Sequence, residues 1–270
     1  MRHSPKGVSI HPDFDALAAA VAARLITKLI DVQNRRGEAT VVLTGGSLGI
    51  ATLAAVASSP ARTAVDWQRV NFWWGDERFV PADDPQRNAR QAQEAMLGLL
   101  PVDPARVHPV PAAGEAADVD AAALDYARAL SDAAAEEELA PGFDEADPRL
   151  PRFDVLLLGV GPDAHVASLF PETAGARTVG ATTVAVHNAP KPPPERVSLT
   201  MEAINTADEV WLAVAGEDKA GAVGLALAGA GPVQVPAAGP SGRSRTRWLI
   251  DQAAASQLPE RLFEQHQLEG

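Results

Sequence analysis

An aspartate and a histidine two residues apart are the side chains of this sequence best suited to catalysis. Asp163 and His165 follow the apolar run 155–159 and a turn that contains Gly161. Such a run is typical of a strand buried on both faces of a parallel sheet, and open α/β sheets place their sites at the carboxyl ends of these strands. A histidine there can act as a general base near neutral pH, because the ordinary imidazole pKa is about 6.5. An ordinary strand-to-helix turn with a capping aspartate would have the same local sequence, so the other segments must decide.

A glycine-rich turn elsewhere in the chain is suited to binding an anion. The predicted strand 40–43 is followed by Gly45, Gly46 and Ser47, and then by a helical segment from residue 48 to residue 57. Glycines let the backbone approach an anion closely, and a helix amino terminus offers unpaired N–H groups. The spacing matches neither a Walker loop nor the G-x-G-x-x-G fingerprint, so ATP and dinucleotides are not indicated.

Three cationic side chains stand beside other predicted strands. Strand 70–74 leads into Asp76, Glu77 and Arg78, where the arginine suits bidentate binding of phosphate or carboxylate and either acid could orient it. Prolines 192–194 stiffen the loop that holds Arg196 just before the segment 197–200, and Lys219 stands near the start of a helix after strand 209–215. Because turns that follow parallel strands share one edge of the sheet, we expect these cations, the Gly-Gly-Ser turn and the Asp/His pair to converge.

Strands alternate with helices along the whole chain. This order predicts an α/β fold with a mostly parallel, twisted, Rossmann-like sheet, helices on both faces and a smaller appended α/β portion. We expect residues 1–270 to form a single domain, in which 141–148 is a surface loop and 166–170 starts a helix or a turn packed on the sheet. Further helices are predicted at 13–36, 88–100, 116–139, 201–207, 216 to about 228 and after the last strand, and further strands at 107–110, 182–187 and 246–250.

Net charge and residue composition limit the kinds of ligand and the kinds of chemistry that the protein can have. The formal net charge of −12 argues against non-specific binding to nucleic acid, which needs a basic face, but it allows a small anionic ligand. The sequence has no cysteine, which excludes disulfides and thiolate catalysis and suits a cytoplasmic protein. No apolar run approaches the ~18 residues that span a membrane, and the amino terminus lacks the apolar core of a signal peptide. The histidines are scattered without the spacing of metal ligands, so we expect neither a metal nor a cofactor.

The sequence resembles the 6-phosphogluconolactonase family from Thr44 to the alanine-rich segment after Asp251. Residues 157–171 carry the family pattern G-x-G-x-D-G-H-x-A-S-L-F-P almost unchanged, and residues 45–47 resemble its phosphate loop. The remaining matches are Asp76-Glu77-Arg78 with Val80 and Asn88, the segment Arg196 to Thr200, and Gly216 with Lys219.

Three departures from the family pattern stand out. Ala164 replaces the glycine between Asp163 and His165, Arg87 replaces a common serine before Asn88, and Leu48-Gly49 replaces a frequent Thr-Pro. The first departure matters if the backbone there has a positive φ, because alanine then costs about 1 kcal/mol or more.

The resemblance implies the fold shared with glucosamine-6-phosphate deaminases and ribose-5-phosphate isomerases. It also implies hydrolysis of 6-phospho-D-glucono-1,5-lactone to 6-phosphogluconate, in the oxidative pentose phosphate pathway, without cofactor or metal. His165 would activate the attacking water, while Asp163 would orient the loop or His165, or stabilise the imidazolium. The substrate would be held by Gly45, Gly46, Ser47, Asp76, Arg78, Arg196 and Lys219. The partner would be this sugar phosphate alone, with the protein a monomer or a weak dimer.

Two alternatives remain from the same residues. A sugar-phosphate deaminase or isomerase would also use an aspartate and a histidine at this turn, for ring opening and proton transfer. A non-catalytic sugar-phosphate sensor would follow if Ala164 disables the loop. A covalent serine route is disfavoured, because Ser168 lies in no G-x-S-x-G elbow.

Overall fold

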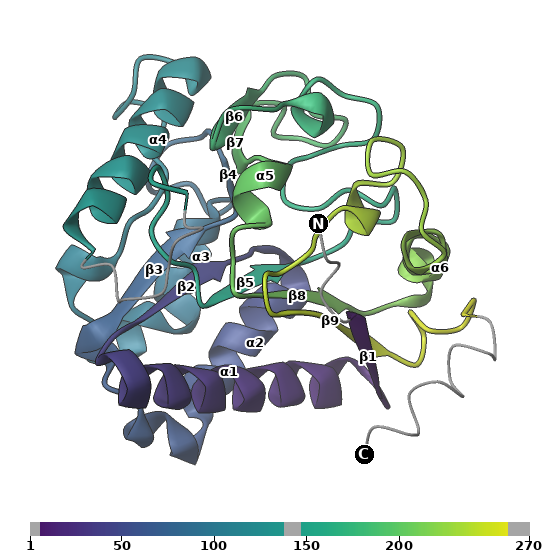
Figure 1. Cartoon of the computed structure of the whole chain (residues 1–270), viewed down its shortest axis with the longest axis horizontal. Helices are drawn as coiled ribbons and strands as arrows, with labels where there is room; N and C mark the ends of the chain where they lie inside the picture. Colours follow the sequence, from purple (N-terminus) through teal and green to yellow (C-terminus); the bar gives the residue numbers. More distant parts are fainter. Residues whose placement is uncertain (1–5, 138–146, 259–270) are drawn as a thin grey trace.

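A fully parallel six-stranded sheet forms the centre of the protein (Figure 1). The computed structural model describes residues 6–137 and 147–258. The strand order is β1-β9-β8-β5-β2-β3. The strands are β1 (Lys6–His11), β2 (Ala39–Leu43), β3 (Val70–Trp74), β5 (Val155–Leu158), β8 (Glu209–Val214) and β9 (Arg245–Asp251).

A second, antiparallel sheet of three strands lies beyond the carboxyl edge of the first. Its order is β4 (Asp76–Arg78), β7 (Arg196–Leu199) and β6 (Thr183–Val186). A single glycine, Gly75, separates β3 from β4, and its carbonyl accepts a hydrogen bond from the N–H of Leu199 at 2.8 Å. The parallel α/β sheet and the smaller appended portion were both predicted, and both are confirmed.

Helices cover both faces of the parallel sheet, as Figure 1 shows. Successive residues of a strand point to opposite faces, so Val155 and Leu157 of β5 join one apolar core while Leu156 and Leu158 join the other. The first core packs against α1 (Phe14–Arg36), α2 (Gly46–Ser58) and α3 (Asn88–Ala95). The second packs against α4 (Val119–Glu136), α5 (Met201–Ile204) and α6 (Ala220–Leu227).

The helix signals in the sequence act as expected at α1. Asp13 caps its amino terminus by accepting a hydrogen bond from the N–H of Ala16 at 2.8 Å. Gly37 ends the helix in the left-handed conformation, with φ of 85°. Thr200 likewise caps α5 by accepting a hydrogen bond from Ala203.

Several predicted elements differ in the structure. Residues 76–78 form strand β4 rather than a charged turn, and the predicted helix 88–100 ends at Ala95, before a 3₁₀ turn at Leu97–Leu99. Residue 107 makes only an isolated bridge to β3. Residues 166–170, predicted to start a helix or a turn, form a turn. Strand β1 was not predicted. After β9, residues 252–258 form turns rather than the predicted carboxyl-terminal helix, and the rest of that predicted helix, with most of the predicted loop 141–148, lies outside the described residues.

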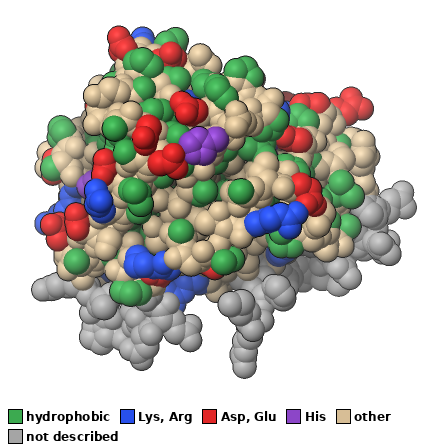
Figure 2. Space-filling model, turned by 90° about the horizontal axis from the view of Figure 1, so that it is seen from above, with side chains coloured by type: hydrophobic (Ala, Val, Ile, Leu, Met, Phe, Trp, Pro, Cys, Tyr) green, Lys and Arg blue, Asp and Glu red, His purple; other side chains and the backbone are tan. Residues whose placement is uncertain are grey.

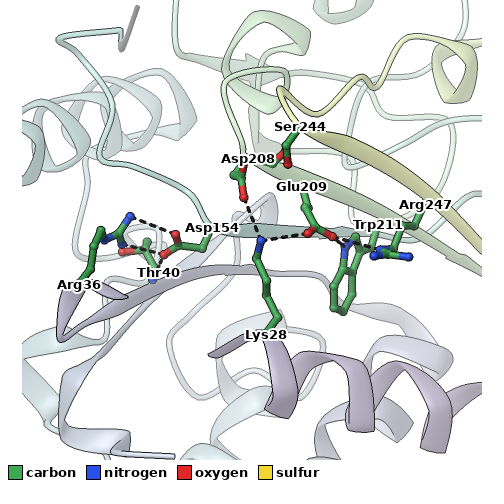
Figure 3. A network of polar contacts seen from close by, with 9 residues as sticks. All are labelled: Lys28, Arg36, Thr40, Asp154, Asp208, Glu209, Trp211, Ser244 and Arg247. Carbon is green, nitrogen blue, oxygen red and sulfur yellow. Dashed lines mark hydrogen bonds and ion pairs between the residues drawn. The ribbon is translucent and has the colours of Figure 1, made fainter. Parts of the chain in front are cut away.

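A network of ion pairs ties α1 to the amino-terminal edge of the parallel sheet (Figure 3). The Nζ atom of Lys28 lies 2.9 Å from carboxylate oxygens of both Asp208 and Glu209, at the start of β8. Arg36 makes a bidentate contact with Asp154, at 3.0 and 2.8 Å, just before β5. Asp154 also accepts a hydrogen bond from the N–H of Thr40. The charged side chains of this network therefore hold the beginnings of the strands together.

Exposed large apolar side chains are few and scattered over the described surface. Figure 2 looks onto the side that carries the second sheet and α4, where acidic side chains are spread widely and apolar ones are scattered singly. The large apolar side chains that are exposed come from separate elements: Ile10, Leu99, Leu124, Val179 and Leu225. Within the described ranges, no helix combines the length and the apolar character that crossing a membrane requires.

Candidate active site

A cavity opens at the carboxyl edge of the parallel sheet, where the second sheet leans over it. Its empty volume is about 510 Å³, a figure that includes solvent space at the open mouth. The wall is built from the segments after β2 and β5 and from β4, β7 and the start of α3. It includes Thr44 to Gly46, Asp76, Arg78, Asn88, Gly159 to Gly161, His165, Ala167 and Arg196.

His165 and Asp163 form a hydrogen-bonded pair in the turn after β5. Nδ1 of His165 lies 2.5 Å from Oδ1 of Asp163. Burial alone would raise the pKa of the Asp163 carboxyl, but its contacts with His165 and Lys191 outweigh burial and lower that pKa below its ordinary value. Burial lowers the pKa of His165, and the carboxylates of Asp163 and Asp76 only partly counteract this. At neutral pH the pair is therefore a carboxylate and a neutral imidazole.

This charge state determines the tautomer of His165. An ionised carboxylate can only accept hydrogen bonds, so Nδ1 must carry the proton that points at Asp163. Nε2 then keeps its lone pair and is the basic atom of the ring. The Phe170 ring packs against the imidazole, with 4.6 Å between ring centroids, and restricts its movement.

The turn that carries this pair depends on Gly161. Its N–H donates to the carbonyl of His165 at 3.0 Å, and its carbonyl accepts from the N–H of Ala164 at 2.9 Å, which closes the loop. A Cβ at position 161 would lie 2.1 Å from both Cε1 and Nδ1 of His165, closer than atoms can approach. Only glycine leaves room for the imidazole in this position.

Ala164 does adopt a positive φ, of 65°. This is the conformation in which alanine is strained by about 1 kcal/mol relative to glycine. Its methyl group is buried in the apolar core, which recovers about 0.8 kcal/mol. The two effects nearly cancel, and the Asp163–His165 contact is intact beside this residue.

The amino terminus of α2 forms the opposite wall. The helix begins at Gly46, two residues earlier than predicted, so the glycine-rich turn itself supplies the first helical N–H groups. No side chain caps this end, and the N–H groups of a first helical turn have no acceptor within the helix. A Cβ at Gly45 would lie 1.9 Å from Oδ1 of Asn88, so this glycine allows α2 and α3 to meet. Ser47 lies in the same helical turn but not among the residues that line the cavity.

Strand pairing brings Arg78 and Arg196 together, because β4 and β7 place them directly opposite each other. The Arg78 guanidinium donates from Nη1 to Oδ1 of Asn88 at 2.5 Å and to the carbonyl of Gln86 at 2.9 Å. Its Nε is buried and has no hydrogen-bond partner among the described residues. A buried donor without a partner is costly, and Arg78 lines the cavity, so its guanidinium is suited to binding an anion there.

The neighbouring acids have different roles. Oδ2 of Asp76 accepts a hydrogen bond from the hydroxyl of Ser168 at 2.7 Å, while the carboxylate of Glu77 faces away from the guanidinium of Arg78 toward the backbone. Glu77 accepts the N–H groups of Arg78, Asn88 and Ala89, each at 2.8 Å, and so caps α3. Burial raises the pKa of the Glu77 carboxyl, although the positive charge of Arg87 acts to lower it. Nε of Arg87 lies 3.9 Å from Oε2 of Glu77. The side chain that orients the Arg78 guanidinium is Asn88, which was not among the predicted site residues.

Lys219 is not brought to the cavity in this structure. Its Nζ lies 3.0 Å from both carboxylate oxygens of its neighbour Asp218, in the turn before α6. The side chain is absent from the cavity wall, so a contact with substrate stays a prediction. Ser168 is fully buried and its hydroxyl is engaged with Asp76.

Comparison with known proteins identifies the relatives of this chain. Residues 12–248 match the family described as glucosamine-6-phosphate isomerases/6-phosphogluconolactonase. The chain belongs to this family. It is 56% identical to the 6-phosphogluconolactonase of Streptomyces coelicolor, across 94% of this chain and 95% of that protein. It is 45% identical to the 6-phosphogluconolactonase of Mycobacterium tuberculosis, across 93% and 98%.

A solved structure of the same family agrees over nearly the whole fold. The 6-phosphogluconolactonase of Trypanosoma brucei superposes with a TM-score of 0.80 at 26% identity, covering 96% of this chain and all of the other. The predicted family resemblance is thus confirmed.

Two contacts within the site have no counterpart in the sequence interpretation. Asn88 was noted only as part of a family pattern, and nothing in the local sequence distinguishes it from any residue that opens a helix. Lys191 precedes the prolines of the predicted stiff loop and was not among the predicted site residues, yet its Nζ lies 3.2 Å from Oδ1 of Asp163. The two contacts join residues 10 and 28 positions apart in different elements, so only the tertiary structure reveals them.

Proposed function

We propose that this protein hydrolyses 6-phospho-D-glucono-1,5-lactone to 6-phosphogluconate, with His165 as general base. The observation that carries the proposal is the neutral imidazole of His165. It is hydrogen-bonded to an ionised Asp163 and lines the same cavity as Arg78 and Arg196. A base and an anion-binding wall in one cavity are what a phosphorylated lactone requires.

The reaction begins when Nε2 of His165 takes a proton from a water molecule. The water oxygen bonds to the lactone carbonyl carbon, and the carbonyl electrons move onto its oxygen. When this tetrahedral intermediate collapses, the bond between the carbonyl carbon and the ring oxygen breaks. The leaving ring oxygen receives the proton from the imidazolium, which restores the neutral base. Asp163 keeps Nδ1 protonated throughout and stabilises the imidazolium by its charge.

The phosphate group binds at the opposite wall. Nε of Arg78, the guanidinium of Arg196 and the N–H groups of Gly45, Gly46 and Ser47 at the start of α2 supply its donors. Asp76 faces the sugar hydroxyls, and Lys219 reaches the phosphate after leaving Asp218. These contacts place C1 of the substrate beside His165.

We also propose the wider setting given by the sequence. The chain acts as a single domain, supported by one apolar core that contains both Leu156 of the parallel sheet and Val197 of the second sheet. It works in the oxidative pentose phosphate pathway in the cytoplasm, which the lack of cysteine supports. A monomer or weak dimer is supported by the scattered placement of exposed apolar side chains on the described surface.

The test compares lactone loss in buffer alone, with the wild-type protein and with His165→Asn. The wild-type protein should accelerate hydrolysis above the spontaneous rate, and the variant should lose about 10²–10⁴-fold in kcat. Thermal unfolding and binding of 6-phosphogluconate serve as controls, and both should stay close to wild type. Near-wild-type turnover by the variant would remove His165 from the mechanism, while release of ammonia from glucosamine 6-phosphate would identify a deaminase instead.

A further inference from the structure

The loop between β6 and β7 contacts the catalytic pair through a lysine. Nζ of Lys191 lies 3.2 Å from Oδ1 of Asp163, and this oxygen also accepts from Nδ1 of His165 at 2.5 Å. A single carboxylate oxygen thus receives both the imidazole and an ammonium group. The side chain of Lys191 is about half exposed, so it comes to Asp163 over the surface rather than from the core.

The backbone of this loop is fastened to the cavity wall. Arg196 donates from Nη2 to the carbonyl of Lys191 at 2.9 Å and from Nε to the carbonyl of Pro193 at 3.1 Å. The N–H of Ala189 donates to the carbonyl of Pro194 at 2.8 Å, which closes the loop on itself. Three successive prolines limit the remaining backbone freedom. The position of Lys191 is therefore set by Arg196, a residue that lines the cavity.

The geometry points to Lys191 as a positioning residue of this site: its ammonium group holds the Asp163 carboxylate in the orientation that accepts the Nδ1 proton of His165. This inference rests on one part of the proposed function, the role of His165 as general base. Lys191 does not line the cavity and acts through Asp163, so it has no contact with the reacting atoms.

The charge of Lys191 also affects the proton equilibrium of His165. The charged groups that act on the imidazole are Asp163 in its own turn, Asp76 on β4 and Lys191 on the loop. On another side the imidazole packs against Phe170, whose ring centre lies 5.6 Å from the guanidinium carbon of Arg196. Both carboxylates favour the imidazolium, and Lys191 opposes it. Loss of Lys191 should therefore leave more of His165 protonated, and inactive, at mildly acidic pH.

The experiment compares Lys191→Met, Lys191→Arg and the control Arg128→Met in the full chain. Arg128 forms an exposed ion pair with Asp125 on α4 and has no contact with the cavity, so its variant removes a comparable charge elsewhere. Two measurements are made on each protein: NMR titration of the His165 ring without substrate, assigned with His165→Asn, and the pH profile of kcat and KM for lactone hydrolysis.

In Lys191→Met we expect the pKa of His165 to rise by about 0.2–0.7 unit, the size expected for loss of a partly exposed ion pair. The acid limb of kcat should move by the same amount, with kcat at pH 8 about two- to fivefold lower and KM nearly unchanged. Lys191→Arg should restore both values, and Arg128→Met should match wild type.

An unchanged pKa of His165 in Lys191→Met would overturn the inference, and so would failure of arginine to restore it. A raised KM with an unmoved pH profile would also overturn it, because Lys191 would then be a substrate contact. The NMR titration needs no turnover, so it still tests Lys191 if the wild-type protein fails to hydrolyse the lactone.

Discussion

Gly161→Ala tests whether the imidazole position seen in the structure is the working one. The added Cβ would lie 2.1 Å from Cε1 and Nδ1 of His165 and 2.5 Å from Oδ1 of Asp163. The ring must therefore move by about 1.4 Å to reach an ordinary contact of about 3.5 Å. Gly161 does not have a positive φ, so the backbone accepts alanine and the collision falls on the catalytic pair.

This displacement should reduce activity far more than stability. A misplacement of about 1 Å in a catalytic group can cost about 10²-fold, which corresponds to about 2.7 kcal/mol in the activation free energy. Overpacking at one position costs about 1–3 kcal/mol of unfolding free energy, so the variant should remain folded at 25 °C. We expect kcat/KM for lactone hydrolysis to fall about 100-fold.

The assay measures lactone disappearance after subtraction of the spontaneous rate, with circular dichroism to verify folding. Gly75→Ala is the matched control, because its Cβ would meet only atoms at 3.7–3.9 Å, ordinary contact distances, in the same region of the sheet. That control should retain wild-type activity within about twofold. A folded Gly161→Ala protein with kcat/KM within about threefold of wild type would refute the inferred role of the His165 position.

Three further predictions address phosphate binding, proton transfer and the strained turn. Arg78→Ala should raise KM for the phosphorylated lactone about 10–100-fold with little change in kcat, since it removes a charged donor, and an unchanged KM would exclude Arg78 as a phosphate contact. On the acid side of its pH profile, kcat/KM should fall with a midpoint below pH 6.5, because burial lowers the pKa of His165. Activity is lost only as pH falls through that pKa, so a midpoint above pH 7 would contradict the role of His165 as general base. Ala164→Gly should keep the free energy of unfolding within about 1 kcal/mol of wild type. Glycine removes the strain of the positive φ, but it also loses the buried methyl group and gives the unfolded chain more conformational entropy. A change in urea-unfolding free energy above 2 kcal/mol, or a large gain in turnover, would show that Ala164 impairs the loop.

The arrangement of the parallel sheet follows from the sequence because its strands are apolar on both faces. Four such segments, each followed by glycine or by polar residues, predict that their carboxyl ends form one edge, and the cavity lies there. The turn of Asp163 and His165 was singled out from residue type and spacing, and the other strand-end turns of the sheet then favoured a functional interpretation. Strand β1 escaped prediction because an edge strand of six residues, with few apolar side chains and partial exposure, has no comparable signal.

The second sheet could not be predicted from local sequence. Asp76, Glu77 and Arg78 have no apolar alternation, so they resemble a solvated turn, and they become a strand only by pairing with β7. The same pairing sets Arg78 opposite Arg196 across more than a hundred residues of sequence. Lys219 is the opposite case: local sequence places it near the start of a helix, and in this structure its neighbour Asp218 engages the ammonium group. Its contact with substrate stays a prediction.

The cavity can favour an anion although the whole protein carries a formal charge of −12. The carboxylates nearest to it are already engaged, Asp76 with the Ser168 hydroxyl and Asp163 with His165 and Lys191. Arg78, by contrast, keeps a buried Nε without a partner among the described residues, and the start of α2 adds uncapped N–H groups. Under the proposed function, long-range attraction would not recruit a phosphate to so acidic a protein, so we expect recognition to come from these short-range donors. We therefore expect the strand pairing of β4 with β7, rather than overall charge, to suit this sheet edge to a sugar phosphate.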